Sequence, residues 1–228
     1  MSGELPSSIG HLSVLTRLNL SNNRLVGPIP NSIVKCFYLI SIDLSGNSFT
    51  GNIPQLIGVL YNLQHLNFSS NNLNGSIPLS IEHCIDLRVL DFHSNNLSGD
   101  IPLGISELRR LVVLNLSYNQ LSGIMPDIFQ NDLVNLNLSR NYLYSHIPKT
   151  IRSPKLETLD LSYNRFYGFV PSSLGKCFQL KTINLQFNWL FPIIPRSVSS
   201  LPNLIKINMP ENHDAINFNY NRKYITVE

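Results

Sequence analysis

The sequence predicts an α/β solenoid, in which one short unit recurs along the chain and each copy stacks on the next. Three sets of residues recur at a common phase about 24 residues apart, which is typical of a repeat array. Each unit opens at a leucine: Leu15, Leu39, Leu63, Leu87, Leu111, Leu133, Leu156, Leu180 and Leu204. An asparagine follows in every unit: Asn23, Asn47, Asn71, Asn95, Asn119, Asn141, Asn164, Asn188 and Asn212. A proline keeps the same spacing: Pro6, Pro30, Pro54, Pro78, Pro102, Pro126, Pro148, Pro171 and Pro195.

The unit that opens at Leu87 shows why the pattern begins with a strand and a turn. Its Leu-x-x-Leu-x-Leu start predicts a short strand, in which Leu90 and Phe92 point inward and alternate with outward residues. Asn95 follows where the chain turns and buries backbone polar groups. Its amide can bond to neighbouring turns, so we expect the nine asparagines to form a structural ladder along the stack.

The second half of the same unit returns the chain to the next strand. Gly99 permits a tight or positive-φ step, and Ile101 re-enters the core. Pro102 fixes its own φ and disfavours a helix just before it. Residues 103–107 are therefore expected to form a short helical or 3₁₀ turn on the convex side.

The repeats divide the chain into three parts. Residues 1–14 match only the second half of a unit and are expected to be a partial N-terminal repeat without a cap. Residues 15–212 hold nine repeats, of which the fifth and sixth are shortened. Residues 213–228 have no repeat signal and are expected to form either a tail or a partial C-terminal cap, with Phe218, Tyr220 and Tyr224 over the last core layer.

The cysteines predict buried thiols. Cys36, Cys84 and Cys177 stand where other repeats place a core leucine, so each should be a small buried hydrophobe. Stacked strands lie about 4.8 Å apart, which puts Cys36 and Cys84 roughly 9–10 Å from each other. That separation exceeds the ~7 Å limit for a disulfide, and we expect three free thiols.

Composition narrows the function classes. The 228 residues carry a net charge of +3 with 14% charged residues, so no basic stripe suits nucleic acid. No apolar run is long enough to span a membrane. Nor does the N-terminus contain the charged and apolar regions of a signal peptide.

Read together, the motif Leu-x-x-Leu-x-Leu-Ser-x-Asn-x-Leu-Ser-Gly-x-Ile-Pro resembles the plant-type leucine-rich repeat. Residues 15–30, 63–78 and 111–126 are good examples, and the resemblance covers about residues 3–212. It implies a right-handed superhelix with a parallel sheet on the concave face, short 3₁₀ or helical turns on the convex side, and a second short strand around Leu-Ser-Gly-x-Ile-Pro. The cysteine-containing N-terminal cap usual in the family has no match here, which suggests a piece of a longer protein.

The resemblance implies a binding module. In that family the repeats form ligand-binding ectodomains of receptor-like kinases and receptor-like proteins, which would place this chain at the cell surface. The expected partner is a protein or peptide on the concave face, and the resemblance allows for a co-receptor as well. Two alternatives stay open: a secreted inhibitor of the polygalacturonase-inhibiting kind, and a non-enzymatic intracellular scaffold.

One concave column is the main candidate binding site. The residues just before the ladder asparagine in four successive repeats are bulky: Tyr118, Arg140, Tyr163 and Phe187. At the strand spacing they should lie side by side over roughly 15 Å. Aromatic residues and arginine are favoured interface anchors. The alternative is that the rings only shield the sheet edge. A second aromatic group contains Phe166, Tyr167, Phe169, Trp189 and Phe191. Phe166 should be core, and Trp189 is expected either exposed on the flank or packed against Tyr167 or the tail.

The sequence gives no indication of catalysis or of a cofactor. His65 and His93 face the concave side near Asp91 and are further candidate ligand-binding residues, but their spacing along the strands is too wide to share a metal ion. Serine and aspartate recur with the repeat on this face, which argues against a unique catalytic triad.

Of six Asn-x-Ser sequons, Asn74 and Asn96 lie outside the concave-strand consensus and are the better glycosylation candidates.

Overall fold

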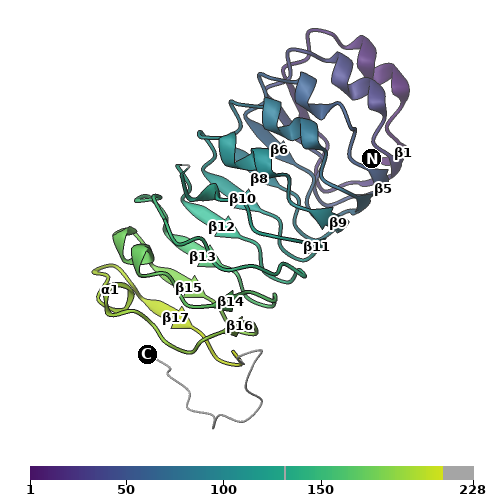
Figure 1. The fold of residues 1–228 in the computed structure, drawn as a ribbon. Helices are drawn as coiled ribbons and strands as arrows, with labels where there is room; N and C mark the ends of the chain where they lie inside the picture. The colour runs from purple at the N-terminus through teal and green to yellow at the C-terminus, as the bar shows by residue number, and fades with distance from the viewer. Residues whose placement is uncertain (131, 213–228) are drawn as a thin grey trace.

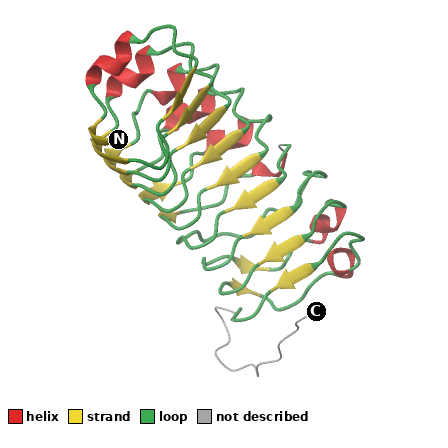
Figure 2. Cartoon of the chain, turned by 180° about the vertical axis from the view of Figure 1, so that it is seen from behind, coloured by secondary structure: helices red, strands yellow, loops and turns green. Residues whose placement is uncertain are grey.

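The computed structural model confirms the α/β solenoid and describes residues 1–130 and 132–212. The chain forms a curved stack, with parallel strands along one side and short helical turns along the other (Figures 1 and 2). The expected tail or cap at residues 213–228, including Phe218, Tyr220 and Tyr224, lies outside the described residues.

The concave sheet contains one strand from each full repeat. Neighbours pair in parallel with matching repeat phase, for example Leu90 opposite Leu114. Alternation places the central residue of each strand in the core and its two neighbours on the concave face. Its strands are β2 (Arg17–Asn19), β4 (Ser41–Asp43), β6 (His65–Asn67), β8 (Val89–Asp91), β10 (Val113–Asn115), β12 (Asn135–Asn137), β13 (Thr158–Asp160), β15 (Thr182–Asn184) and β17 (Lys206–Asn208).

A second parallel sheet forms the lateral face, as the resemblance implies. Its larger part contains β1 (Ser2–Glu4), β3 (Arg24–Pro28), β5 (Ser48–Asn52), β7 (Asn72–Gly75), β9 (Asn96–Asp100) and β11 (Gln120–Ser122). Its smaller part pairs β14 (Tyr167–Gly168) with β16 (Trp189–Leu190). Residues 142–146 bridge the two parts, because Tyr144 N donates to Gly123 O at 2.9 Å and Tyr167 N donates to Ser145 O at 3.1 Å.

Short helical turns cover the convex side. The residue before most of them is a proline, such as Pro78, which has extended backbone before Leu79–His83. Tight stacking requires glycine at Gly58, where an added Cβ would lie 1.9 Å from Ser80 O. The turns are η1 (Ser7–His11), η2 (Asn31–Lys35), η3 (Ile57–Val59), η4 (Leu79–His83), η5 (Leu103–Glu107), η6 (Ile128–Gln130), η7 (Ser172–Lys176) and α1 (Arg196–Ser199).

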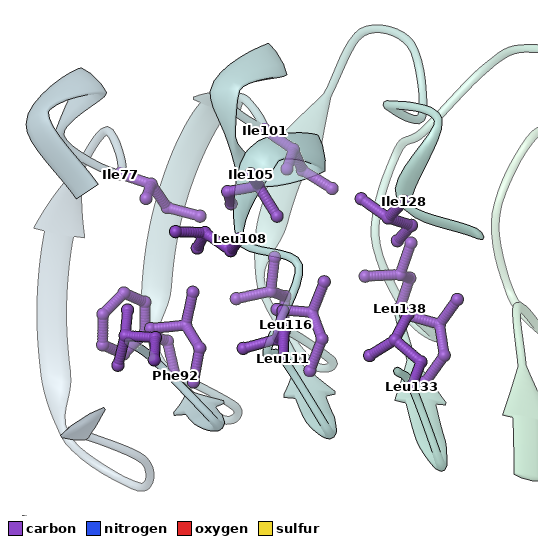
Figure 3. Packing of buried hydrophobic residues seen from close by; sticks show 14 of the residues in the cluster. Ile77, Phe92, Ile101, Ile105, Leu108, Leu111, Leu116, Ile128, Leu133 and Leu138 are labelled. Atoms are coloured by element: carbon purple, nitrogen blue, oxygen red, sulfur yellow. The ribbon is translucent and has the colours of Figure 1, made fainter. Parts of the chain in front are cut away.

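The core runs between these layers along the whole stack. Leucine and isoleucine from successive repeats lie in columns, as Figure 3 shows for Leu111, Leu133 and their neighbours. One repeat could not bury this apolar surface alone, so each depends on the next. The three cysteines lie in this core as free thiols, which confirms that they are buried. Burial raises the pKa of Cys84 to about 12 and that of Cys177 to about 11.

The asparagine of each repeat joins its own turn to the turn of its neighbours. Asn95 Nδ2 donates to Phe68 O at 2.9 Å in the preceding repeat and to Phe92 O at 3.2 Å in its own. Its Oδ1 accepts the Leu73 N–H at 3.0 Å. The side chain is 7% exposed, so these bonds satisfy groups that water cannot reach.

Candidate functional site

The structure brings the four bulky concave residues into one continuous stack. The guanidinium carbon of Arg140 lies 4.9 Å from the Tyr118 ring centroid and 4.1 Å from that of Tyr163. The Tyr163 ring in turn stacks on Phe187, with 4.3 Å between centroids and 18° between planes. We call Tyr118, Arg140, Tyr163 and Phe187 the concave stack. It crosses four repeats next to strands β10, β12, β13 and β15.

The turn after each concave strand positions these side chains. Each of the four has a φ between 53° and 55°, in the left-handed region. The backbone is held there by the next repeat, since Tyr118 N donates to Ser139 O at 3.0 Å and Arg140 N donates to Ser162 O at 2.9 Å. Every repeat has this geometry, and others place Asn22, Gly46, Ser70, Ser94 or Glu211 at the same point.

Bulky residues are a poor local choice for that backbone. The left-handed conformation costs an ordinary L-residue roughly 1–2 kcal/mol, whereas glycine adopts it freely and asparagine tolerates it. Tyrosine, arginine and phenylalanine therefore work against the turn at four successive repeats. A backbone outlier of this kind is a reason to look for function.

The stack is exposed and carries an unpaired positive charge. Tyr118 is 53% exposed and Phe187 41%. Arg140 is also exposed, and within residues 1–130 and 132–212 it forms no ion pair. The guanidinium therefore gives this exposed surface a positive charge, flanked by aromatic rings. The arrangement suits a ligand with an anionic group and apolar neighbours.

The two concave histidines lie outside the stack. His65 is in β6, and His93 follows β8. His93 Nδ1 lies 2.7 Å from Asp91 Oδ1, and its Nε2 lies 3.5 Å from Ser70 Oγ. The groups of a Ser-His-Asp relay are thus adjacent.

In the part of the chain that the structure describes, the backbone beside these three groups offers no oxyanion site. The backbone N–H groups of Ser70 and Asn71 donate to His93 O and Ser94 O, so neither is left to stabilise a developing oxyanion. The described residues contain no cluster of three potential metal ligands.

The remaining concave polar residues mostly bond to their own strand. Asn115 Oδ1 accepts the Ser117 hydroxyl at 2.8 Å, and Asp160 Oδ1 accepts the Ser162 hydroxyl at 2.6 Å. The sequons Asn74 and Asn96 lie elsewhere, on the lateral face in β7 and β9, where they are exposed and opposite each other in register.

The sequence indicated the stack but not its backbone. The common phase put the four residues side by side, whereas their positive φ was not expected; Gly46 in the same column was the available signal. In the second aromatic group, Phe166 is buried as predicted, and Trp189 is 41% exposed opposite Tyr167.

Stacked repeats with a parallel concave sheet, an asparagine ladder and a lateral sheet define a leucine-rich-repeat solenoid. Family models described as leucine-rich repeat match residues 14–36, 38–60, 62–84, 86–108 and 109–166. The chain belongs to the leucine-rich-repeat proteins, and its structural neighbours place it with those of the plant type. No curated protein sequence matches it.

Solved structures of plant receptors are similar along most of the chain. The plant peptide hormone receptor RGFR1, solved with RGF2, has 35% identity and a TM-score of 0.86, with 92% of this chain and 34% of that chain covered. The Arabidopsis receptor kinase HAESA, solved with the peptide hormone IDA and the co-receptor SERK1, has 31% identity and a TM-score of 0.84. The match covers 92% of this chain and 36% of the HAESA chain. The chain thus spans about a third of each receptor chain.

The same fold occurs in a protein of another kind. A plant ice-binding protein has 27% identity and a TM-score of 0.71, with 94% of this chain and 81% of that chain covered. Fold alone therefore does not assign function, which must be argued from the site. In the described residues, no helix is long and apolar enough to cross a membrane.

Proposed function

We propose that the chain is a ligand-binding segment of a plant-type cell-surface receptor and that it perceives a protein or peptide at the concave stack. The observation that carries this is Arg140, which forms no ion pair among the described residues and lies between two tyrosine rings, on a backbone that disfavours all three residues. The ligand-bound plant receptors with the same fold support the proposal.

Arg140 gives the ligand its chemistry. A guanidinium held between Tyr118 and Tyr163 loses little conformational freedom on binding, because the rings already fix it. No carboxylate of residues 1–130 or 132–212 pairs with its N–H groups, which can therefore bond a carboxylate or another anionic group of the ligand. Tyr163 and Phe187 extend the contact with apolar ring edges. The expected ligand is a segment that has an acidic group beside one or more apolar side chains.

The proposal assigns no catalytic step to the chain, and it includes a co-receptor only as a further prediction. The Asp91–His93–Ser70 arrangement has a nucleophile and a base but no free backbone donor beside it among the described residues. The alternative role, in which the rings only shield the sheet edge, does not explain why a charged residue, Arg140, lies between them.

Selection of displayed random peptides on the wild-type chain tests the proposal. We expect selected peptides to be enriched in aspartate, glutamate or a free C-terminal carboxylate. The matched control is selection on Arg140→Ala, where this enrichment should disappear. Arg165→Ala serves as a second control, because Arg165 is also exposed and stands over a ring, that of Tyr142, at 5.2 Å. Selected peptides without acidic preference on the wild-type chain would refute the assignment of Arg140.

A further inference from the structure

The lateral face changes composition halfway along the stack. Its outward residues stand one, three and five positions after each ladder asparagine. In the second to fourth repeats these are small and polar: Ser48, Thr50, Asn52, Asn72, Asn74, Ser76, Asn96, Ser98 and Asp100. In the sixth to eighth repeats the same positions are mainly aromatic. We call Tyr142, Tyr144, Tyr167, Phe169, Trp189 and Phe191 the lateral aromatic face.

These side chains form one surface. Neighbouring strands of the lateral sheet pair with an offset of two positions relative to the repeat, so Tyr167 lies opposite Trp189. The Phe169 and Phe191 rings stack with 4.4 Å between centroids, and the ring of His146 lies 4.3 Å from that of Tyr167. Backbone bonds from residues 142–146 to both neighbouring repeats keep the face continuous. In Figure 1 this surface belongs to the part of the stack around β14 and β16, below β9 and β11.

The lateral aromatic face exposes more apolar area than is usual for a monomer. Phe169 is 59% exposed, Tyr144 52% and Tyr142 50%. Ile124 and Ile193, at the margins of the face, are also more than half exposed. Because large aromatic side chains offer about 150–250 Å² each, the face presents on the order of 700 Å² of mostly apolar surface. The largest apolar patch of an ordinary monomer is roughly 300–600 Å², whereas each partner of a standard interface buries about 800 Å².

Ring orientation favours a protein surface over a flat ligand. Phe169 and Phe191 cover each other's faces, with 20° between their planes, so the pair turns ring edges outward. Bases and sugars stack on open ring faces. A partner that packs between rows of ring edges must instead carry ridges and grooves of matching spacing.

A second copy of this chain has the matching spacing, because its own lateral aromatic face carries the same rows of side chains. Its rows of side chains follow the same strand pitch of about 4.8 Å, so the rows of one copy can pack into the grooves of the other. Edge-to-face contacts between aromatic rows are favourable, and tyrosine, tryptophan and arginine are the residues most common in interface centres. We propose that the lateral aromatic face is a homodimer interface, in which the sixth to eighth repeats of two chains pack face to face.

The chain itself offers substitutions that preserve the fold. Serine already occupies the positions of Tyr167 and Phe169 in other repeats, at Ser98 and Ser76, and asparagine occupies that of Trp189 at Asn96. The interface variant is therefore Tyr167→Ser/Phe169→Ser/Trp189→Asn. The control variant is Thr50→Ser/Asn52→Ser/Asn72→Ser, on the polar half of the same face, where all three residues are exposed.

Sedimentation velocity of the full chain over about 1–100 µM tests the proposal. The wild-type and control chains should dimerise with similar dissociation constants, and the interface variant should raise that constant at least tenfold. Circular dichroism melting should show that the variant is folded; Tyr167→Ser alone provides a milder change if the triple variant is not. A wild-type chain that stays monomeric, or an interface variant that dimerises as the control does, would overturn the proposal.

Salt dependence provides a second readout. If apolar rings hold the dimer, its dissociation constant at 1 M NaCl should be equal to or lower than that at 0.05 M NaCl. Salt screens charges and does not weaken apolar contacts. A tenfold weaker dimer at high salt would place the contact on charged residues instead and would contradict the proposal.

Discussion

The guanidinium carbon of Arg140 lies 4.1 Å from the Tyr163 ring centroid, and both residues have a left-handed backbone. A stacked cation of this kind is worth about 0.5–1 kcal/mol at an exposed site. The backbone of each residue costs roughly 1–2 kcal/mol. For this pair, the contact between guanidinium and ring does not repay the conformational cost of the two backbones in the free protein, which favours a binding role over a structural one.

Stability and binding should separate at Tyr118. Tyr118→Asn removes the weaker ring contact, at 4.9 Å, and places a residue that tolerates positive φ. We expect the free energy of unfolding to stay equal or rise by up to about 1 kcal/mol, while affinity for selected peptides falls. Urea unfolding and calorimetric titration measure the two quantities. Loss of stability by more than 1 kcal/mol would show that the ring supports the fold.

The asparagine ladder should matter more than its exposed neighbours. Asn95→Ala leaves the Leu73 N–H without its acceptor in a buried turn. It also removes one of the two ladder amides that bond to Phe68 O and one of the two that bond to Phe92 O. The expected loss is about 1–3 kcal/mol. Asn96→Ala, one residue further and exposed, should change the unfolding free energy by less than about 0.5 kcal/mol. Equal effects of the two substitutions would argue against the ladder.

Buried thiols should make the protein less stable in alkali. The pKa of Cys84 is raised by burial to about 12, from 9.0 for an exposed thiol. Between these values the unfolded chain loses the proton and the folded chain keeps it, so stability is full below pH 9 and falls as the pH rises toward 12. One such group contributes a slope of about 1.4 kcal/mol per pH unit.

A matched variant isolates that slope from other alkaline titrations. Cys84→Ala should flatten the decline of unfolding free energy between pH 9 and 10.5, although it lowers stability at pH 7 by opening a small cavity. Identical slopes for the two proteins would mean that Cys84 ionises as easily in the folded state as in the unfolded one.

Repeat phase predicted most of the architecture because each position has one role in every unit. The sequence alone predicts Leu90 and Cys84 in the core and Asn95 in the turn. The same repeat phase predicts that the four residues of the concave stack lie side by side. Two features were not predicted. Positive φ at Tyr163 contradicts the preference of tyrosine and depends on bonds to the next repeat. Tyr142 and Tyr144 were not recognised as part of a surface, because contacts on the lateral face depend on a two-residue stagger that spacing does not reveal.

The most direct test of the proposed function compares Arg140 with Arg165. Both are exposed arginines over tyrosine rings, but only Arg140 belongs to the concave stack. An acidic peptide selected on the wild-type chain is titrated calorimetrically into wild type, Arg140→Ala and Arg165→Ala. We predict that Arg140→Ala weakens binding at least tenfold, or about 1.4 kcal/mol, and that Arg165→Ala leaves it unchanged. Equal affinity for all three proteins, or equal loss in both variants, would contradict recognition at the concave stack.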